Sequence, residues 1–347
     1  MIVFHEEVRF FYSFFQKMKV TIDEWSANQR FDRFLRKFFK SYPQITLSDI
    51  FSAMRKGEIL LNGKKKKGEV RVNLWDEIEI FDLLVKDEVT VRNHSAQEIK
   101  AKQLSKISKE EIKKMIIYED ENRIVFNKPA GIVLHESKKH RNDLSMNDYL
   151  EFYASDCTQG TFKPSFWYRL DKDTSGVLVG AKNYEALQYL NEIIRERNID
   201  KTYLTLVAWK TPKKFTITKS IERVYNQKFD RAKMVLNDDG LDCKTECETI
   251  QTFKSSFLGT ISFLRVKIYT GRMHQIRIHL ASEGYPVLGD LIYGNPVINR
   301  KLNKEFHITR QLLHCYQYSF REMSGDLMSF TAPIPEDFEK VLEKMKG

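Results

Sequence analysis

The residues best suited to chemistry lie in one short stretch, residues 168–182, which reads YRLDKDTSGVLVGAK. Its first half is polar and turn-forming, and residues 177–181 form a small apolar run typical of a buried strand. A loop at the start of a core strand exposes a side chain while the strand holds it in place, which suits a catalytic carboxylate. Asp171, two residues after Arg169, is therefore a candidate nucleophile or acid–base group. The alternative for this motif alone is an Asp-rich turn closed by its own hydrogen bonds.

The stretch lies within residues 113–347, where several strands and a few helices must hold it in position. Residues 183–198 have the apolar spacing of an amphipathic helix, and a similar helix lies near the end of the chain. Residues 118–135 predict two strands about a Pro-Ala-Gly turn, and residues 201–210 predict a further strand. Residues 214–270 alternate repeatedly between apolar and polar side chains. This order predicts an α+β body around a mixed, mainly antiparallel sheet.

Length, charge and cysteine content narrow the class of protein. The 347 residues are too many for one ordinary core and suit two or three modules. A net charge of +10 predicts attraction to polyanions, with nucleic acid as the first candidate and plain solubility charge as the alternative. No apolar run is long enough to span a membrane. The four cysteines form no CxxC pair, so we expect no zinc site and reduced, cytosolic thiols.

The front of the chain predicts a compact basic module over residues 19–84. Residues 30–40 have helical apolar spacing, and a second helix is expected from Thr46 to Lys56, with Leu47 facing inward and Gly57 as its C-cap. An Asn-Gly turn then predicts a hairpin followed by a further strand. Before this module, an extension over residues 1–18 either packs on the body or precedes the true start of translation at Met18. After it, the charged and weakly patterned residues 85–112 predict a linker, with a partial helix within it as the alternative.

Basic side chains of the front module fall largely opposite the apolar helix face and along the hairpin. Such an arrangement suits contacts with the phosphates of a nucleic acid. A solvated hairpin tip is the alternative for the run of four lysines. The residues expected to contact RNA are Arg30, Arg33, Arg36, Lys37, Arg55, Lys56, Lys64 and Lys65.

The front module resembles the S4 domain, a small RNA-binding fold of ribosomal and RNA-modifying proteins. Arg30, Asp32 and Leu35 match the R-x-D-x-x-L signature, and residues 57–62 match G-x-x-x-V-N with leucine in place of valine.

The body resembles the RluA family of pseudouridine synthases over essentially its full length. The resemblance is carried, in order, by NKPAGIVLH (127–135), YRLDKDTSGVLVGAK (168–182), KTYLTLV (201–207) and TGRMHQIRIHLASEGYPVLGDLIYG (270–294). The family breaks the C1′–N glycosidic bond of a uridine in RNA, turns the base and rejoins it through C5. It needs no metal or redox cofactor, so the resemblance implies none here.

The resemblance also implies roles for five residues. Asp171 would attack the sugar C1′ or take part in proton removal there, and Arg277 would pair with it and favour its ionised form. Tyr203 would stack on the target base and serve as the base at C5, and Ile276 would pack on the uracil. Arg169 would contact the RNA and help to flip the uridine. Each of these side chains, taken alone, has an ordinary alternative in the core or on the surface.

Three further positions in these motifs need an interpretation. The family usually has histidine where this chain has Tyr168, which keeps a ring and a polar tip but no positive charge near neutral pH. His274 and His279 lack the neighbours of a metal site, so we expect both to form structural hydrogen bonds.

An S4-like module in front of this body resembles the family branch that acts on large-subunit ribosomal RNA. The resemblance implies that this RNA or its assembly precursor is the partner of a cytoplasmic monomer that binds neither membrane nor metal. One alternative is an inactive RNA-binding protein of ribosome assembly on the same fold. Another is a hydrolytic RNA glycosylase that uses Asp171 together with Asp173.

Overall fold

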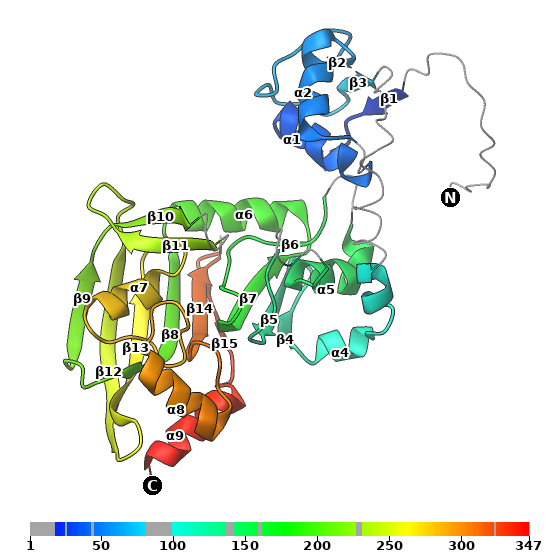
Figure 1. Cartoon of the computed structure of the whole chain (residues 1–347). Helices are drawn as coiled ribbons and strands as arrows, with labels where there is room; N and C mark the ends of the chain where they lie inside the picture. The colour runs from blue at the N-terminus through cyan, green and yellow to red at the C-terminus, as the bar shows by residue number, and fades with distance from the viewer. Residues whose placement is uncertain are drawn as a thin grey trace. The chain divides into compact units, whose positions relative to one another are not determined.

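The computed structural model of the chain describes most of the sequence (Figure 1). The described residues are 18–24, 26–42, 45–80, 99–135, 140, 142–158, 162–226, 231–322 and 324–346. Residues 1–17 of the expected extension and residues 85–98 of the expected linker lie outside these ranges. The chain divides into two compact units, Met1–Ile99 with Gln159–Phe162 and Lys100–Thr158 with Lys163–Gly347. No helix in the described ranges has the length and apolar character needed to cross a membrane.

The front unit packs two helices on a small antiparallel sheet of order β1-β3-β2. Local sequence explains its second helix, because Thr46 and Asp49 form a capping box at the start and Gly57 adopts a φ of 86° at the end. Phe31 and Phe34 pack with Ile50 in a core separate from that of the second unit. The elements are β1 (Met18–Thr21), α1 (Phe31–Phe38), η1 (Phe39–Ser41), α2 (Leu47–Lys56), β2 (Ile59–Leu61) and β3 (Glu77–Ile80).

Two expectations for the front unit are wrong. Residues 64–74 were expected to add a strand after the Asn62-Gly63 turn, but they form none, and β2 pairs directly with β3. The turn itself has the expected positive φ at both residues. A run of four lysines repels itself and has low strand propensity, which explains why it stays outside the sheet. Leu47 is 45% exposed because it lies at the first position of α2, before the face that Ile50 and Met54 bury.

The second unit is built on a large mixed sheet of order β4-β5-β7-β14-β8-β13-β12-β9, with β6 beside β7 and β15 beside β14. Among the described strands only β7 and β14 pair in parallel, so the expected mainly antiparallel sheet is confirmed. The strands are β4 (Ile116–Glu119), β5 (Arg123–Lys128), β6 (Ser165–Phe166), β7 (Ser175–Ala181), β8 (Ile199–Ala208), β9 (Lys214–Thr218), β12 (Lys244–Ser255), β13 (Gly259–Ile268), β14 (Leu313–Arg321) and β15 (Leu327–Thr331), with a separate hairpin of β10 (Ile221–Asn226) and β11 (Arg231–Leu236).

Helices cover both faces of this sheet, because apolar side chains that alternate along β8 point to both faces and must be buried on each. Tyr203 and Val207 enter the core shared with α5, α6 and α7, whereas Leu204 and Leu206 enter the core shared with α8 and α9. Figure 1 shows α8 and α9 together at the end of the sheet away from α6. The helical segments are α4 (Lys109–Lys113), α5 (Met146–Tyr153), η4 (Ser155–Cys157), α6 (Tyr184–Arg195), α7 (Gln275–Ser282), α8 (Pro296–Phe306) and α9 (Glu336–Lys346).

Three local features of the second unit differ from the expectation. The strand expected after the Pro129 turn is absent in residues 132–135, where the chain leaves the sheet. Residues 99–104 and α4 are helical, as the partial-helix alternative allowed, but Ile112 is fully buried in the core of this unit, which the sequence did not predict for a linker. The helix α8, begun by an Asn295 cap and Pro296, was not expected from the sequence.

Candidate active site

The loop that carries Asp171 is fixed where it meets the sheet. The Thr174 N–H donates to the Asp171 carbonyl at 3.1 Å, and the loop leads directly into the fully buried β7. Gly176 has a φ of 112°, and a Cβ there would lie 2.1 Å from the Cys315 carbonyl oxygen of β14. Only glycine fits this close approach, so the Thr-Ser-Gly sequence determines where the loop joins the sheet.

Lys128 holds the same loop from the end of β5. Its buried ammonium donates to the carbonyls of Pro129, Lys172 and Thr174 at 2.8, 2.8 and 2.9 Å. Burial lowers the pKa of Lys128 to about 7, although two nearby aspartates oppose the shift. Because three acceptors match the three hydrogens of an ammonium, this geometry favours the charged form. The contacts tie the segment before the loop to the loop itself.

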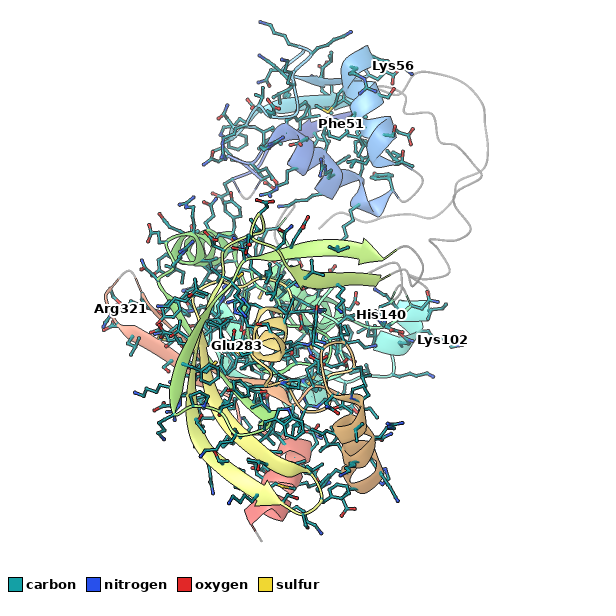
Figure 2. All side chains as sticks on the ribbon, turned by 60° about the vertical axis from the view of Figure 1, so that its left-hand side comes forward. Phe51, Lys56, Lys102, His140, Glu283 and Arg321 are labelled. Atoms are coloured by element: carbon teal, nitrogen blue, oxygen red, sulfur yellow. The ribbon has the colours of Figure 1, made fainter. Side chains whose placement is uncertain are left out.

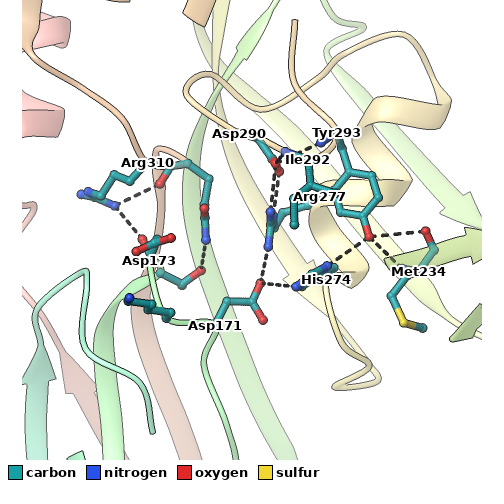
Figure 3. A network of polar contacts seen from close by, with 12 residues as sticks. Asp171, Asp173, Met234, His274, Arg277, Asp290, Ile292, Tyr293 and Arg310 are labelled. Atoms are coloured by element: carbon teal, nitrogen blue, oxygen red, sulfur yellow. Dashed lines mark hydrogen bonds and ion pairs between the residues drawn. The ribbon is translucent and has the colours of Figure 1, made fainter. Parts of the chain in front are cut away.

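Arg277 lies between two carboxylates, as Figure 3 shows. Its Nε and Nη2 donate to both oxygens of Asp290 at 2.6 and 2.9 Å, and its Nη1 donates to Asp171 at 2.9 Å. The N–H groups of Ile292 and Tyr293 also donate to one oxygen of Asp290, at 2.8 and 3.0 Å. The planar guanidinium is thereby fixed by one buried partner and presents its remaining edge to Asp171.

Arg277 and Asp290 each stabilise the charged form of the other. Burial disfavours the charge of Arg277, but hydrogen bonding and attraction to Asp290, followed by attraction to Asp171, outweigh it and raise its pKa. Burial also acts against the charge of Asp290, yet the Arg277 guanidinium lowers the pKa of that carboxyl overall. A permanent positive charge therefore lies beside Asp171, whose side chain is 17% exposed. Such a carboxylate can act as a nucleophile or a base.

Asp171 opens into a cavity of about 360 Å³, a size within the range of small-molecule sites. The structure brings all five side chains expected in the active site, those of Asp171, Arg277, Tyr203, Ile276 and Arg169, to the lining of this cavity. Tyr203 and Ile276 are 5% and 4% exposed, whereas Arg169 is exposed at the rim. They come from three separate parts of the chain, the loop before β7, the strand β8 and the helix α7, so only the fold brings them together.

Tyr203 of β8 contributes a largely buried phenol to the cavity. Burial, followed by the neighbouring Cys315, raises the pKa of Tyr203 well above 10, so the phenol is protonated at rest. Its ring can stack on a base, and its oxygen becomes a strong base once the proton has left.

Tyr168, at the position where the family usually has histidine, is held in the wall of the same cavity. Its hydroxyl donates to the Val177 carbonyl at 2.6 Å, and its ring stacks on Tyr318 at a centroid distance of 4.7 Å. Burial raises the pKa of Tyr168 well above 10. Tyrosine therefore forms a neutral, fixed surface next to Arg169.

The two motif histidines form the expected hydrogen bonds. His279 is fully buried between the Thr245 hydroxyl and the Lys219 carbonyl, at 2.9 and 3.0 Å. His274 lies in the cavity wall, with Nδ1 3.0 Å from the Tyr293 hydroxyl and Nε2 3.9 Å from Asp171. Burial lowers the pKa of His274. A neutral imidazole beside the carboxylate leaves Arg277 as the fixed positive charge that touches Asp171.

In the front unit, basic side chains gather around a depression of about 640 Å³. Of the residues expected to contact RNA, Arg30, Arg36, Arg55 and Lys65 line it. The others do not; Figure 2 shows Lys56 at the end of α2, beyond Phe51, which lines the depression. The structure thus brings together half of the predicted set, with Lys66 and Lys67 as additions that the sequence analysis did not select.

Four residues near Asp171 were not selected from the sequence, although the recognised motifs contain them. Lys128 belongs to NKPAG, Lys201 to KTYLTLV, and Asp290 and Tyr293 to GDLIYG. Their polar types within otherwise apolar runs were the available signal. This signal was insufficient because each of the four side chains contacts residues that are distant in the sequence. Asp290, for example, is linked to Asp171 only through Arg277.

The fold and the site place one carboxylate, held by a guanidinium, at a cavity that Tyr203 also lines. The RNA pseudouridylate synthase family matches residues 122–282, which include Asp171, Tyr203 and Arg277. Ribosomal large subunit pseudouridine synthase C of Vibrio parahaemolyticus is 30% identical over 93% of this chain and 95% of its own length. The enzyme of the same name from Escherichia coli is 30% identical over 94% and 96%. The chain therefore belongs to the RNA pseudouridylate synthase family, whose members are isomerases.

Solved structures support the fold. The human RNA pseudouridylate synthase domain containing 4 protein covers 72% of this chain and 97% of its own, with a TM-score of 0.55 and 19% sequence identity. At that identity the likeness concerns the fold alone. The body of this chain has the pseudouridine synthase fold, with the mixed sheet and flanking helices described above.

Proposed function

We propose that this protein converts specific uridines of large-subunit ribosomal RNA to pseudouridine, with Asp171 as the catalytic residue. The observation that carries the proposal is the Asp171 carboxylate at the cavity, 2.9 Å from an Arg277 guanidinium that Asp290 holds in place. The reaction breaks the C1′–N1 bond and forms a C1′–C5 bond; C5 loses a proton and N1 gains one. Reactant and product are isomers, so no other reactant is consumed, and any bond that Asp171 forms to C1′ is broken again when C1′ is joined to C5.

Each side chain has a role that its surroundings support. Asp171 attacks C1′ or takes part in proton removal there, while Arg277 donates to the carboxylate and holds it in a fixed orientation. Tyr203 stacks on the detached base, and Ile276 packs on the uracil. Arg169, at the rim, contacts the RNA and helps the uridine to leave its stack.

A Tyr203→Phe substitution separates the ring of this residue from its hydroxyl. We expect kcat to fall by about 10²–10⁴-fold, because the hydroxyl takes part in proton transfer at C5. KM should change little, since phenylalanine keeps the stacking surface. Single-turnover and steady-state conversion of a ribosomal RNA fragment would measure both. A Tyr285→Phe variant, outside the cavity lining, is the matched control. Full activity of Tyr203→Phe would limit this residue to stacking.

The front unit acts, in this proposal, as an S4-like RNA-binding module. Support comes from the basic depression lined by Arg30, Arg36, Arg55 and Lys65, with Phe51 available as an apolar contact. We propose that this surface follows the RNA backbone and raises the local concentration of substrate at the second unit. The division into an extension, a module over residues 19–84, a linker and a body from about residue 113 is part of the same proposal.

Deleting residues 1–84 should weaken RNA affinity and flatten its dependence on salt. Each phosphate of a single strand that is no longer neutralised reduces the slope of log K against log salt by about 0.7. Lys65→Gln with Lys66→Gln and Lys67→Gln in the full chain should change the slope in the same direction without removing a unit. Lys340→Gln, on a lysine paired with Glu336, is the control. Equal slopes in all these proteins would contradict the assignment.

We favour the C-type over the D-type target among large-subunit enzymes. The sequences around Arg55–Glu58 and Gly176–Val179 resemble the C type, and the C-type relative from Vibrio parahaemolyticus matches 93% of the chain, against 66% for a D-type relative from Buchnera aphidicola. A ribosomal RNA substrate places the protein in the cytoplasm. The five side chains expected at the active site already meet within one chain, so we propose that a monomer is active.

Two alternatives are less well supported. An inactive assembly protein would have no reason to retain the Asp171–Arg277 pair next to Tyr203 in a cavity. A hydrolytic glycosylase would require Asp173 near the reacting carbon, but Asp173 does not line the cavity. Mapping pseudouridines in large-subunit RNA from cells with and without this gene tests the proposal directly. Loss of specific pseudouridines is expected, and an unchanged map would contradict it.

A further inference from the structure

A second, smaller cavity adjoins the one at Asp171. It has a volume of about 170 Å³ and shares Lys201, Ile268, Gly271 and Arg272 with the larger cavity. The two hollows therefore form one continuous trough along the ends of β8 and β13. Arg197, directly after α6, lines the far part of the smaller cavity. None of the roles assigned above uses this part of the trough.

Lys201 lies at the junction of the two cavities without an acidic partner. Its Nζ is 5.1 Å from the centre of the Tyr168 ring and 5.6 Å from that of Tyr318. Within the described ranges it makes no ion pair and no hydrogen bond through Nζ. Gly271 leaves space beside Nζ, because it has no side chain there. The nearest atom to a Cβ added at Gly271 would be Nζ itself, 3.8 Å away. An ammonium held over aromatic rings, with its hydrogens unused, needs an acceptor from a ligand.

The arginines of the smaller cavity are also available. Arg197 and Arg272 are exposed, and in the part of the chain that the structure describes neither forms an ion pair. Among the residues that the structure describes, no carboxylate lines this cavity. The lysines just outside it differ, since Lys244 pairs with Glu246 at 2.6 Å and Lys267 pairs with Asp200 at 2.5 Å. The unpaired positive charge is therefore concentrated in the trough rather than spread over this surface.

We propose that the smaller cavity binds the nucleotide next to the target uridine, with Lys201, Arg272 and Arg197 holding the adjoining phosphodiester groups. The inference rests on the proposed reaction at Asp171, because it places the neighbouring nucleotide beside the flipped one. The N–H groups of these arginines and of the lysine have no neighbouring carboxylate that competes for them. They can therefore donate to the charged oxygens of a phosphodiester.

Such a clamp would help to extract the uridine. A base that leaves its stack forces the backbone on one side into an unusual path, and charge-assisted contacts to that backbone offset the loss of stacking. These contacts do not distinguish one base from another. The subsite should therefore add affinity and orientation without adding sequence preference.

The test compares Lys201→Met, Arg272→Gln and Arg197→Gln in the full chain with an Arg195→Gln control. Arg195 lies two residues before Arg197, but it pairs with Glu192 at 3.7 Å and is 77% exposed. The probes are fluorescein-labelled oligouridine and oligocytidine of equal length, titrated by anisotropy over a range of salt concentrations. Each subsite variant should reduce the slope of log K against log salt by about 0.7, equally for both probes. The control should match the wild type.

Other outcomes would overturn the subsite. Unchanged slopes in all three variants would mean that no phosphate is bound there, and a loss confined to oligouridine would mean base contacts instead. If Lys201→Met lowered the melting temperature while all slopes stayed equal, Lys201 would be a structural support only. Steady-state conversion of ribosomal RNA should show the loss mainly in KM. The binding assay needs no turnover, so an inactive wild type would refute the proposed reaction without deciding the subsite.

Discussion

Replacing Asp171 with asparagine should abolish pseudouridine formation while leaving RNA binding and folding nearly unchanged. Asparagine has almost the same shape and keeps an oxygen that can accept from Arg277 at the present 2.9 Å. It has no negative charge, so it can neither attack C1′ nor take up a proton there. Loss of a nucleophile typically costs at least about 10⁴-fold in kcat. Conversion of a large-subunit RNA fragment, measured by pseudouridine-specific mapping, should fall below detection.

A matched substitution isolates the chemistry at this loop. Asp173 lies two residues further on and offers its carbonyl to Arg310 at 3.2 Å, but it does not line the cavity. Asp173→Asn should therefore retain turnover. If Asp171→Asn turned over at the wild-type rate, the assignment of the catalytic carboxylate would be wrong. If both variants were equally inactive, the hydrolytic arrangement of two aspartates would regain support.

Replacing Arg277 with methionine should affect stability as well as catalysis. The substitution removes the guanidinium that donates two hydrogen bonds to the fully buried side chain of Asp290. Removing one member of a buried ion pair costs about 3–5 kcal/mol. For a body of this size that corresponds to a fall in melting temperature of roughly 6–20 °C. Conversion of RNA should also be lost, because Asp171 no longer has a fixed positive neighbour. Thermal unfolding and conversion assays would measure the two effects.

A second substitution separates these effects. Adding Asp290→Asn to the Arg277→Met variant removes the uncompensated buried charge, while the amide oxygen can still accept from the Ile292 and Tyr293 N–H groups. Much of the lost stability should return, but activity should not. Arg310→Met is a useful comparison, since its partner Asp337 is 35% exposed and can be solvated. Recovery of activity in the double variant would show that Arg277 acts only through stability.

Local patterns in the sequence were sufficient for the elements whose stability is local. The helix α2 begins and ends where Thr46 and Gly57 predicted, and α6, which begins at an Asn183 cap, lies within the expected helix of residues 183–198. These signals are reliable because a cap is satisfied by atoms within a few residues. The run of small apolar residues in β7 likewise required burial wherever the strand was placed.

Predictions that depended on strand partners were less successful. The strand expected after Asn62-Gly63 does not form, because β2 finds a better partner in β3, beyond a lysine-rich segment. The segment that ends at Ile112 is weakly patterned in sequence, yet it packs on the second unit. A strand or a short helix of low amphipathicity is stabilised by neighbours that sequence patterns do not identify.

The sequence by itself determined which residue types were available for chemistry: an aspartate in a tight loop before a glycine-started strand, a strand tyrosine, and an arginine at the start of a helix. The tertiary structure decided which of them meet. Asp171 and Arg277 are 106 residues apart in sequence, Lys128 donates to the loop from the end of β5, and Asp290 holds Arg277 from beyond α7. Charge and hydrogen-bonding capacity belong to single residues, but a catalytic geometry requires buried side chains from distant strands and helices to share one volume, and only packing of the whole sheet produces that.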